Sequence, residues 1–370
     1  MKIGLIYHQF LHAGGLENYL IEFASRLQAA GHELHIATSR LAPDVATKLK
    51  AQWHMLPRPP VATLRMWHFN RAATKAIKDL PTDVNIGFGR TTHHDMHRAG
   101  GGCHALYSKL LPFWKRYEPK NLIELGLERR LYNSGGTRQF IMNSARVVAQ
   151  IQGIYPGARD KCGVIYTAVD TNVFKPALHR QSHRSLVCRN LNTDPEKPVG
   201  LFVSLSHRRK GLDNLLQAWT DIDGTLWIAG RQLNKHYTSM IERLGLASKV
   251  RAIPPTNQLK DLYQAADWFI HPTLYDACAN TVLQSMASEL PGVISAQDGA
   301  VDHVRDGENG LMLYHPTKVP ELRTRIQDAF AVHEADRIEM GRKARETMLP
   351  HTWDAHVKEW LSAIESLPAR

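Results

Sequence analysis

ADWFIHPTLYDACANTVLQSMASELPGVISAQDG, residues 266–299, is the stretch that decides the fold. Its apolar run Trp268–His271 has the length and composition of a buried strand, and a second such run follows at Gly292–Ser295. Between these runs, the small and polar residues 279–281 begin an expected helix. This alternation predicts a parallel sheet covered by helices, in which ligands bind beyond the carboxyl ends of the strands.

The same stretch contains a predicted binding site for an anion attached to a sugar. The helix start, formed by Ala279, Asn280 and Thr281, offers unpaired N–H groups and positive dipole character to a diphosphate. Asp276 precedes this start, and Gln284 lies eight residues later, about a turn into the helix. One site can hold a phosphate, a sugar hydroxyl and a ribose hydroxyl, so the pattern predicts nucleotide-sugar binding.

Further apolar runs on both sides of this stretch predict the same architecture along the chain. The first 40 residues contain an expected strand at Lys2–Tyr7, the loop HQFLHAGG, a helix with one apolar face that ends at Gly31, and a strand at Glu33–Thr38. The other expected strands are Val84–Phe88, Gln139–Asn143, Val164–Tyr166, Val199–Ser204, Thr225–Ala229 and Val250–Ile253.

The predicted fold class is therefore α/β, with two Rossmann-like, doubly wound domains that face a central cleft. Residues 1–170 form the first domain and residues 171–352 the second, and the helix at about 353–370 is expected to pack back on the first. The polar, basic segment 175–198 is interpreted as a linker with a surface excursion.

Length and composition limit the class of protein. A chain of 370 residues exceeds a usual single core, and no apolar run approaches the roughly 18–20 residues that span a bilayer. The N-terminal run MKIGLIYHQF lacks the features of a signal peptide, so we expect a cytoplasmic protein. Four scattered cysteines predict neither a zinc site nor a disulfide framework, and the net charge of +11 favours an anionic partner.

The chain resembles the retaining glycosyltransferases of family 4, which have the GT-B fold. The resemblance covers nearly the full length and is greatest for the lipopolysaccharide core glucosyltransferase I branch. It rests on five motifs in family order: AGGLENYL (13–20), IYTAVDTNVFKP (165–176), SHRRKGLD (206–213), the segment 276–284 and DGAVDHVRDGENGLM (298–312).

This resemblance implies that a hexose, expected to be glucose, moves from a UDP-sugar to a cell-envelope glycan or glycolipid. Lipopolysaccharide core is the preferred acceptor. It also implies that the acceptor binds the first domain and the nucleotide sugar the second, and that the enzyme uses neither a metal nor a cofactor. The proposed alternatives are a non-catalytic, membrane-associated nucleotide-sugar-binding relative and a nucleotide-sugar epimerase of the same fold.

The resemblance also implies roles for single residues. Gly14 and Gly15 lie near the donor phosphate and the acceptor, and an ordinary tight turn is the alternative for these two glycines. Arg209 and Lys210 clamp the departing diphosphate, whereas Arg208 has no role in the family. A solvated basic turn is the alternative for these three residues.

Asp276 and Gln284 occupy the two ends of a family Glu-x7-Glu pattern, and neither is glutamate. Asp276 is expected to accept hydrogen bonds from sugar hydroxyls. Gln284 is expected to bind the ribose diol without a charge. These two departures are the reason for the non-catalytic alternative.

His104 is the third residue expected to be catalytic, beside Lys210 and Asp276. Related family members have a histidine or aspartate near this point, although the glucosyltransferase branch has aspartate in a segment that here reads Gly100–Gly102. The nearby cluster His93, His94, Asp95 and His97 is interpreted as part of a surface loop, and no metal is assigned to it.

Residues 106–132, LYSKLLPFWKRYEPKNLIELGLERRLY, mix aromatic side chains with lysine and arginine. This composition suits an anionic membrane surface, so we expect peripheral association with the cytoplasmic side of the inner membrane. An amphipathic lid packed on the core is the alternative. Binding of nucleic acid is not expected, because the basic residues are dispersed over two Rossmann-like domains.

Overall fold

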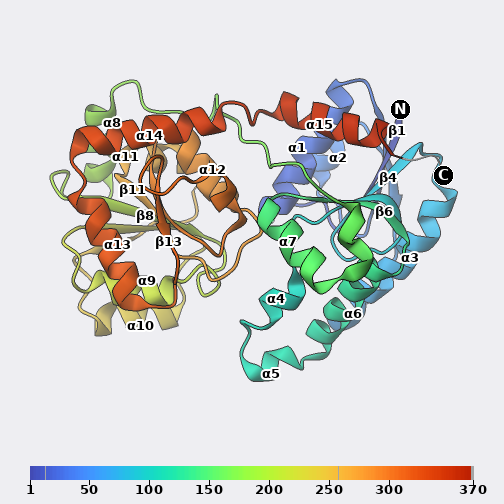
Figure 1. Cartoon of the computed structure of the whole chain (residues 1–370), viewed down its shortest axis with the longest axis horizontal. Coiled ribbons are helices and arrows are strands. Elements are labelled where there is room, and N and C mark those ends of the chain that lie inside the picture. The colour runs from blue at the N-terminus through green and yellow to red at the C-terminus, as the bar shows by residue number, and fades with distance from the viewer. Residues whose placement is uncertain (13, 257, 368–370) are drawn as a thin grey trace. The chain divides into compact units, whose positions relative to one another are not determined.

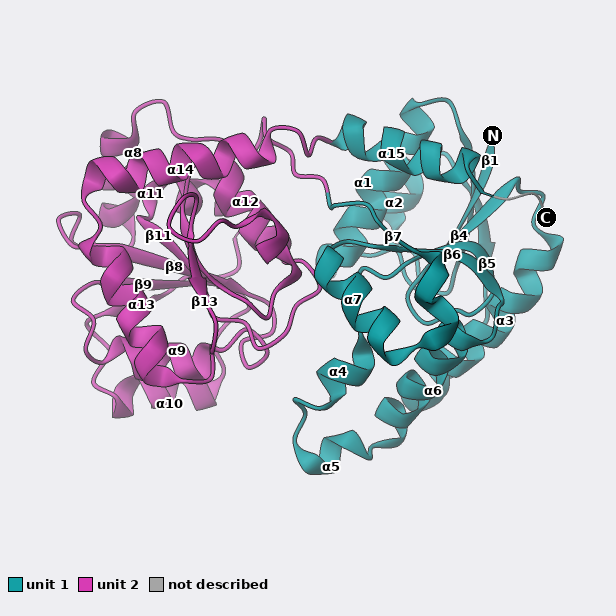
Figure 2. Cartoon of the chain, in the orientation of Figure 1, with its two compact units in different colours: residues 1–167, 353–370 teal, residues 168–352 magenta. Residues whose placement is uncertain are grey.

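The computed structural model describes residues 1–12, 14–256 and 258–367 (Figure 1). The chain divides into two compact units, which Figure 2 shows in different colours. Unit 1 comprises residues 1–167 and 353–370, and unit 2 comprises residues 168–352. The division lies a few residues before the predicted boundary at 170. Residues 368–370 of the predicted C-terminal helix lie outside the described residues.

The sheet of unit 1 is parallel, with the strand order β3-β2-β1-β4-β5-β6-β7. In the shared register, Ile3 of β1 lies opposite Leu34 of β2 and Val84 of β4. The loops that follow β1, β2 and β3 therefore meet at one edge of the sheet. The strands are β1 Lys2–Ile6, β2 Glu33–Thr38, β3 Gln52–Met55, β4 Val84–Phe88, β5 His94–Arg98, β6 Thr137–Met142 and β7 Cys162–Val164.

The prediction of a surface loop at the histidine cluster is wrong, because His94, Asp95 and His97 are buried in β5. Asp95 accepts a hydrogen bond from the backbone N–H of Asn85 at 2.9 Å and pairs with Arg138 at 3.1 Å. Burial lowers the pKa of His94 to about 3 and that of His97 well below its usual value, so both rings are neutral core residues. Within the described residues, no group of three or more acidic, histidine or cysteine side chains is placed to hold a metal.

Helices cover the sheet of unit 1. The first of them, α1, packs with the apolar face that the sequence predicts. In α1, Tyr19, Phe23 and Leu27 are buried, and Gly31 after the helix has a φ of +85°, a conformation that favours glycine. The helices of unit 1 are α1 Gly15–Ala29, α2 Pro43–Lys48, α3 Arg65–Asp79, α4 His104–Ser108, α5 Phe113–Arg116, α6 Pro119–Asn133, α7 Ala145–Ile154, α15 Trp353–Glu365 and the 3-10 helices η1 Ala62–Leu64 and η2 Pro156–Lys161.

The C-terminal helix α15 packs against α1 in unit 1. Trp360 is completely buried in the apolar cluster that also contains Phe23. His356 is within hydrogen-bond distance of the Tyr19 hydroxyl, at 2.7 Å, and of the carbonyl oxygen of Tyr166. The end of the chain is thus part of the core of the first unit.

The sheet of unit 2 is also parallel, with the order β10-β9-β8-β11-β12-β13. Its strands are β8 Val199–Ser204, β9 Thr225–Gly230, β10 Val250–Ala252, β11 Trp268–His271, β12 Gly292–Ser295 and β13 Leu311–Leu313. Its helices are α8 Arg180–Asn190, α9 Leu212–Trp219, α10 Lys235–Arg243, α11 Leu259–Ala265, α12 Asn280–Ala287, α13 Val319–Ala331, α14 Glu334–Met348 and the 3-10 helix η3 Gly299–His303. Because β11 lies between β8 and β12, the loops that follow these three strands are neighbours.

The interpretation of residues 175–198 as a linker is also wrong, because this segment contains α8, which packs on α11. Arg180 and Arg184 of α8 form ion pairs with Asp267 at 2.9 and 2.8 Å. Within this polar sequence, Val187 and Cys188 are buried and belong to the core of unit 2. In the part of the chain that the structure describes, no helix has the length and apolar character needed to cross a membrane.

Candidate functional site

A loop that requires glycine joins β8 to α9 and contains the predicted cations. Gly211 at its end has a φ of +82°, in the left-handed region. A Cβ atom at this position would lie 2.1 Å from the carbonyl oxygen of Pro272, in the loop after β11. No side chain fits there, so glycine allows the loops after β8 and β11 to approach each other closely.

Arg209 and Lys210 both bind the carboxylate of Asp276, which follows β11. The Oδ2 atom of Asp276 lies 2.6 Å from Nη1 of Arg209 and 2.5 Å from Nζ of Lys210. Burial opposes ionisation of this carboxyl, but Lys210 and Arg209 outweigh it and hold the pKa of Asp276 well below its usual range. An ammonium and a guanidinium therefore converge on one point in the loop, an arrangement that suits an anion such as phosphate.

A buried Asp298–His271 pair, which the sequence reasoning missed, lies beside this cluster. Oδ2 of Asp298 accepts a hydrogen bond from Nε2 of His271 at 2.8 Å, and Nζ of Lys210 lies 3.3 Å from the same nitrogen. Burial and Lys210 lower the pKa of His271, so its ring is neutral and donates from Nε2. The available signal was an acid three residues after the predicted strand Gly292–Ser295.

The same aspartate also holds the start of α12. Oδ1 of Asp298 accepts hydrogen bonds from the backbone N–H groups of Ala279 at 3.0 Å and Ala300 at 2.8 Å. The Ala279 N–H, which we expected from the sequence to bind a ligand, thus donates to Asp298 instead. Among the described residues, the N–H groups of Asn280 and Thr281 have no acceptor, and the buried Thr281 hydroxyl also lacks a partner. These three polar groups remain for a ligand.

Gln284 lies one turn into α12, where its side chain is held by a buried tyrosine. Its Oε1 atom accepts a hydrogen bond from the Tyr263 hydroxyl at 3.2 Å, and Tyr263 itself is almost completely buried. This contact orients the amide and leaves its NH₂ group as the donor for a ligand. Unit 2 therefore brings the predicted residues of the second domain to one edge of its sheet, at the ends of β8 and β11.

Gly14 and Gly15 lie at the start of α1 in unit 1. Gly14 has an extended backbone, with a φ of −179°, and neither glycine has a positive φ. A left-handed backbone conformation is therefore not the reason for glycine at these two positions. A Cβ at Gly14 would lie 3.1 Å from Oε2 of Glu17, the end of a flexible side chain, so a larger residue would need only a small shift of Glu17.

His104 lies at the start of α4 in unit 1, with a ring held by α6. Its Nε2 atom is 2.8 Å from Oδ1 of Asn121 and 3.4 Å from Glu124. Burial, aided by Arg90, lowers the pKa of His104 and favours the neutral ring. Its backbone N–H donates to the completely buried Glu128 at 2.7 Å. The histidine thus belongs to a polar network that also has a structural role.

Comparisons with known proteins match both units. The family model Glycosyltransferase Family 4 matches residues 13–173, and Glycosyl transferases group 1 matches residues 197–331. The chain is 20% identical over 340 residues to the lipopolysaccharide glucosyltransferase WaaG of Escherichia coli (strain K12), covering 89% of each chain.

Two solved structures show the same fold. A crystal structure of WaaG, a glycosyltransferase involved in lipopolysaccharide biosynthesis, has a TM-score of 0.84 at 18% identity, over 98% of this chain and 100% of that one. The Anabaena protein Alr3699/HepE, crystallised with UDP-glucose, has a TM-score of 0.77 at 17% identity, over 99% and 100%. The chain therefore belongs to the group 1, family 4 glycosyltransferases and has the GT-B fold.

Proposed function

We propose that this protein is a retaining, metal-independent hexosyltransferase that moves glucose from UDP-glucose to a cell-envelope glycan or glycolipid, preferably lipopolysaccharide core. The observation that carries the proposal is the cationic pair Arg209–Lys210 beside the free N–H groups at the start of α12. The similar Escherichia coli protein is named a lipopolysaccharide glucosyltransferase, and the Anabaena protein binds UDP-glucose. These names support the choice of sugar, nucleotide and acceptor.

The residues of unit 2 are suited to stabilise a departing diphosphate. As the bond between the sugar C1 and the diphosphate oxygen breaks, negative charge develops on UDP, and Lys210 and Arg209 neutralise it. The N–H groups of Asn280 and Thr281 add two fixed donors. With the two cations engaged by phosphate, the carboxylate of Asp276 is available to accept hydrogen bonds from sugar hydroxyls, while Gln284 binds the ribose diol.

The acceptor oxygen would attack C1 on the face that the diphosphate leaves, which retains the anomeric configuration. The new C1–O bond forms as the old one breaks, and the acceptor proton passes to a departing phosphate oxygen, so no covalent enzyme intermediate is required. The cations already supply the charge that a metal would otherwise provide. We propose that Gly14 and Gly15 lie near the donor phosphate and that His104 lies near the reacting carbon.

Calorimetry with UDP, GDP, ADP and their glucose conjugates tests the donor class. We expect UDP and UDP-glucose to bind, because their ribose and diphosphate groups meet Gln284, Lys210 and Arg209. GDP and ADP carry the same two groups, so the expected preference for uridine rests on the UDP-glucose complex of the Anabaena protein. Slow release of glucose from UDP-glucose without acceptor identifies an enzyme, whereas binding without turnover identifies a non-catalytic relative. Conversion of the bound sugar to its epimer would instead identify an epimerase. Absence of binding by any nucleotide contradicts the proposal.

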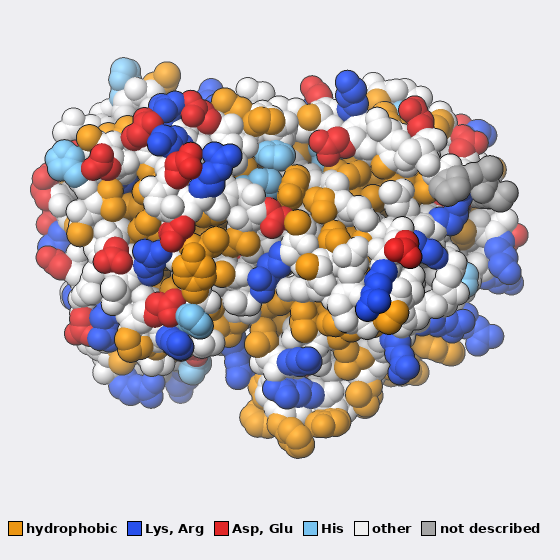
Figure 3. Space-filling model, in the orientation of Figure 1, with side chains coloured by type: hydrophobic (Ala, Val, Ile, Leu, Met, Phe, Trp, Pro, Cys, Tyr) orange, Lys and Arg blue, Asp and Glu red, His pale blue; other side chains and the backbone are white. Residues whose placement is uncertain are grey.

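The segment between α4 and α6 is proposed to contact the inner membrane. Phe113, Trp114 and Tyr117 are 70%, 69% and 62% exposed, and Lys115 and Arg116 lie between them in the sequence. Figure 3 shows hydrophobic side chains with lysine and arginine at the lower edge of the molecule, where α5 lies. Aromatic rings beside cations are suited to an interface that contains anionic lipid.

Flotation with phosphatidylglycerol vesicles measures this association. Replacing Phe113 and Trp114 by serine is expected to weaken binding at least about tenfold, because each ring loses roughly 1 kcal/mol or more of apolar burial. The control is Tyr314→Ser, which removes an aromatic side chain 52% exposed in unit 2. Equal flotation of the double variant and the wild-type protein would exclude this segment as the contact.

A further inference from the structure

Unit 1 contains a cavity of about 540 Å³ at the carboxyl ends of β1, β2 and β3. Ligands of such sheets bind at this edge. The residues that line the cavity come from the loops after these strands and from the helices α1, α3 and α6. A second cavity of about 410 Å³ lies between α3 and residues 57–59, and both cavities include Pro57 and Arg58.

The inner lining of the larger cavity is polar and neutral or acidic. The carboxylate of Glu17 is largely buried and accepts hydrogen bonds from the Tyr7 hydroxyl at 3.1 Å and from Gln9 at 2.8 Å. Burial lowers the pKa of His8 to about 4; Glu17 opposes this, while Arg40, Arg58 and Lys120 add to it. A neutral imidazole, an amide and a carboxylate are hydrogen-bonding partners suited to sugar hydroxyls.

The lining also contains four cations, Arg40, Arg58, Arg65 and Lys120, together with apolar side chains and the acid Glu124. In the described part of the chain, none of the three arginines forms an ion pair with a carboxylate, and Lys120 lies 4.0 Å from Glu124. Arg65 donates instead to the carbonyl oxygens of Pro59 and Pro60. Desolvation and the neighbouring charges of Arg65 and Arg40 lower the pKa of Arg58, so Arg58 is repelled by both of these arginines.

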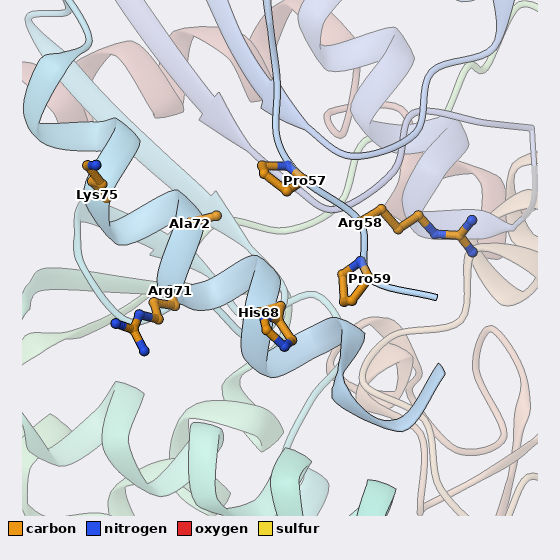
Figure 4. Close-up of a pocket in the computed structure, with 7 residues that line it drawn as sticks. All are labelled: Pro57, Arg58, Pro59, His68, Arg71, Ala72 and Lys75. Carbon is orange, nitrogen blue, oxygen red and sulfur yellow. The ribbon is translucent and has the colours of Figure 1, made fainter. Parts of the chain in front are cut away.

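The positive charge continues along α3. Its basic residues recur at intervals of three or four, which places them on one face of the helix. They are Arg65, His68, Arg71, Lys75 and Lys78. Figure 4 shows that Pro57 and Pro59 lie beside this helix, whereas the side chain of Arg58 points away from Arg71 and Lys75. Arg58 therefore adds its charge to the larger cavity, and Arg71 and Lys75 extend the positive field beyond it.

We propose that this cavity binds a sugar that carries phosphate, with the hydroxyls on Glu17, Gln9 and His8 and the phosphate on Arg40, Arg58 and Arg65. This rests on the proposed function and on the expectation, from the family resemblance, that the first domain binds the acceptor. It adds the acceptor's class: a phosphorylated glycan. Guanidinium groups bind phosphate oxygens through paired, charge-assisted hydrogen bonds. An uncharged glycan would leave the three arginines without an ion-pair partner.

The test is calorimetry on the full chain with saturating UDP, so that the donor site is occupied. Three probes are compared: deacylated lipopolysaccharide core oligosaccharide with its phosphates, the same oligosaccharide after removal of phosphate by hydrofluoric acid, and inorganic phosphate. We expect the phosphorylated form to bind at least about tenfold more tightly than the other two. In Arg58→Ala and Arg40→Ala the advantage over the dephosphorylated form should disappear.

The control is Arg189→Ala, which removes an exposed arginine of α8 that forms no ion pair in the described structure. It should keep the full preference. Equal binding of the two oligosaccharides by the wild-type protein, or an undiminished preference in both arginine variants, overturns the inference. If inorganic phosphate binds as tightly as the phosphorylated oligosaccharide, the proposal that the cavity binds the sugar hydroxyls is overturned. If the protein binds UDP in these experiments, the proposed function stands in each of these cases. If it binds no UDP, both the proposed function and this inference are contradicted.

Discussion

Replacing Lys210 by alanine is expected to lower kcat/KM for glucosyl transfer by about 10²–10³-fold, the loss that follows removal of one group that stabilises transition-state charge. Lys210 is buried and its ammonium lies 2.5 Å from Asp276, so its position is set before any ligand arrives. In the proposed reaction its charge lies where the diphosphate leaves, and we expect that Arg209 alone does not compensate for its loss. Steady-state kinetics with UDP-glucose and acceptor measure the change, and calorimetry with UDP separates binding from turnover.

The matched control for this variant is Arg208→Ala, two positions earlier in the same loop. Arg208 is exposed, whereas Lys210 is buried. We expect this control to change kcat/KM by less than about threefold, because an exposed charge is strongly screened by solvent. If Arg208→Ala and Lys210→Ala lose activity equally, the loop acts through general positive charge and not through a placed ammonium.

Replacing Asp298 by alanine is expected to destabilise unit 2 by about 3–5 kcal/mol. Asp298 is completely buried and accepts hydrogen bonds from His271, Ala279 and Ala300. Each buried donor that loses its acceptor costs roughly 1–3 kcal/mol. The midpoint of thermal unfolding should therefore fall by about 10 °C, at roughly 2–4 °C per kcal/mol for a domain of this size.

The same substitution should also weaken UDP binding, because the start of α12 loses the bond at Ala279. Asp298→Asn is the conservative comparison: it retains an oxygen for the two backbone N–H groups and changes only the partner of His271. We expect it to keep most of the stability. An alanine variant that unfolds within a degree or two of the wild-type protein would show that Asp298 has no such structural role.

Several elements could be predicted from the sequence because their signal is local. The predicted bounds of Glu33–Thr38, Val84–Phe88, Val199–Ser204, Trp268–His271 and Gly292–Ser295 agree with those of β2, β4, β8, β11 and β12. Each is an apolar run of strand length, and a strand buried on both faces by helices needs such a run. The helix α1 followed from its apolar face and from Gly31.

The strands β3 and β5 were missed because they lack that signal. The sequences QWHM and HDMHR are not apolar runs, and a polar strand is recognisable only by its neighbours. In β5, a buried aspartate is satisfied by the backbone of β4 and by Arg138, contacts that involve residues 10 and 43 positions away. Only five residues separate β4 from β5, so no helix marks the crossover between them.

For the candidate site, the sequence by itself determined the residue types and their place after the strands: the cations Arg209 and Lys210 after β8, and Asp276 before α12. Local pattern is enough for this, because the carboxyl end of a strand is visible in the chain. Tertiary structure alone decided that both cations bind Asp276, that Asp298 occupies the N–H of Ala279, and that His271 lies beside Lys210. These contacts arise because β11 lies between β8 and β12 in the sheet, and strand order is a property of the folded chain that no local pattern contains.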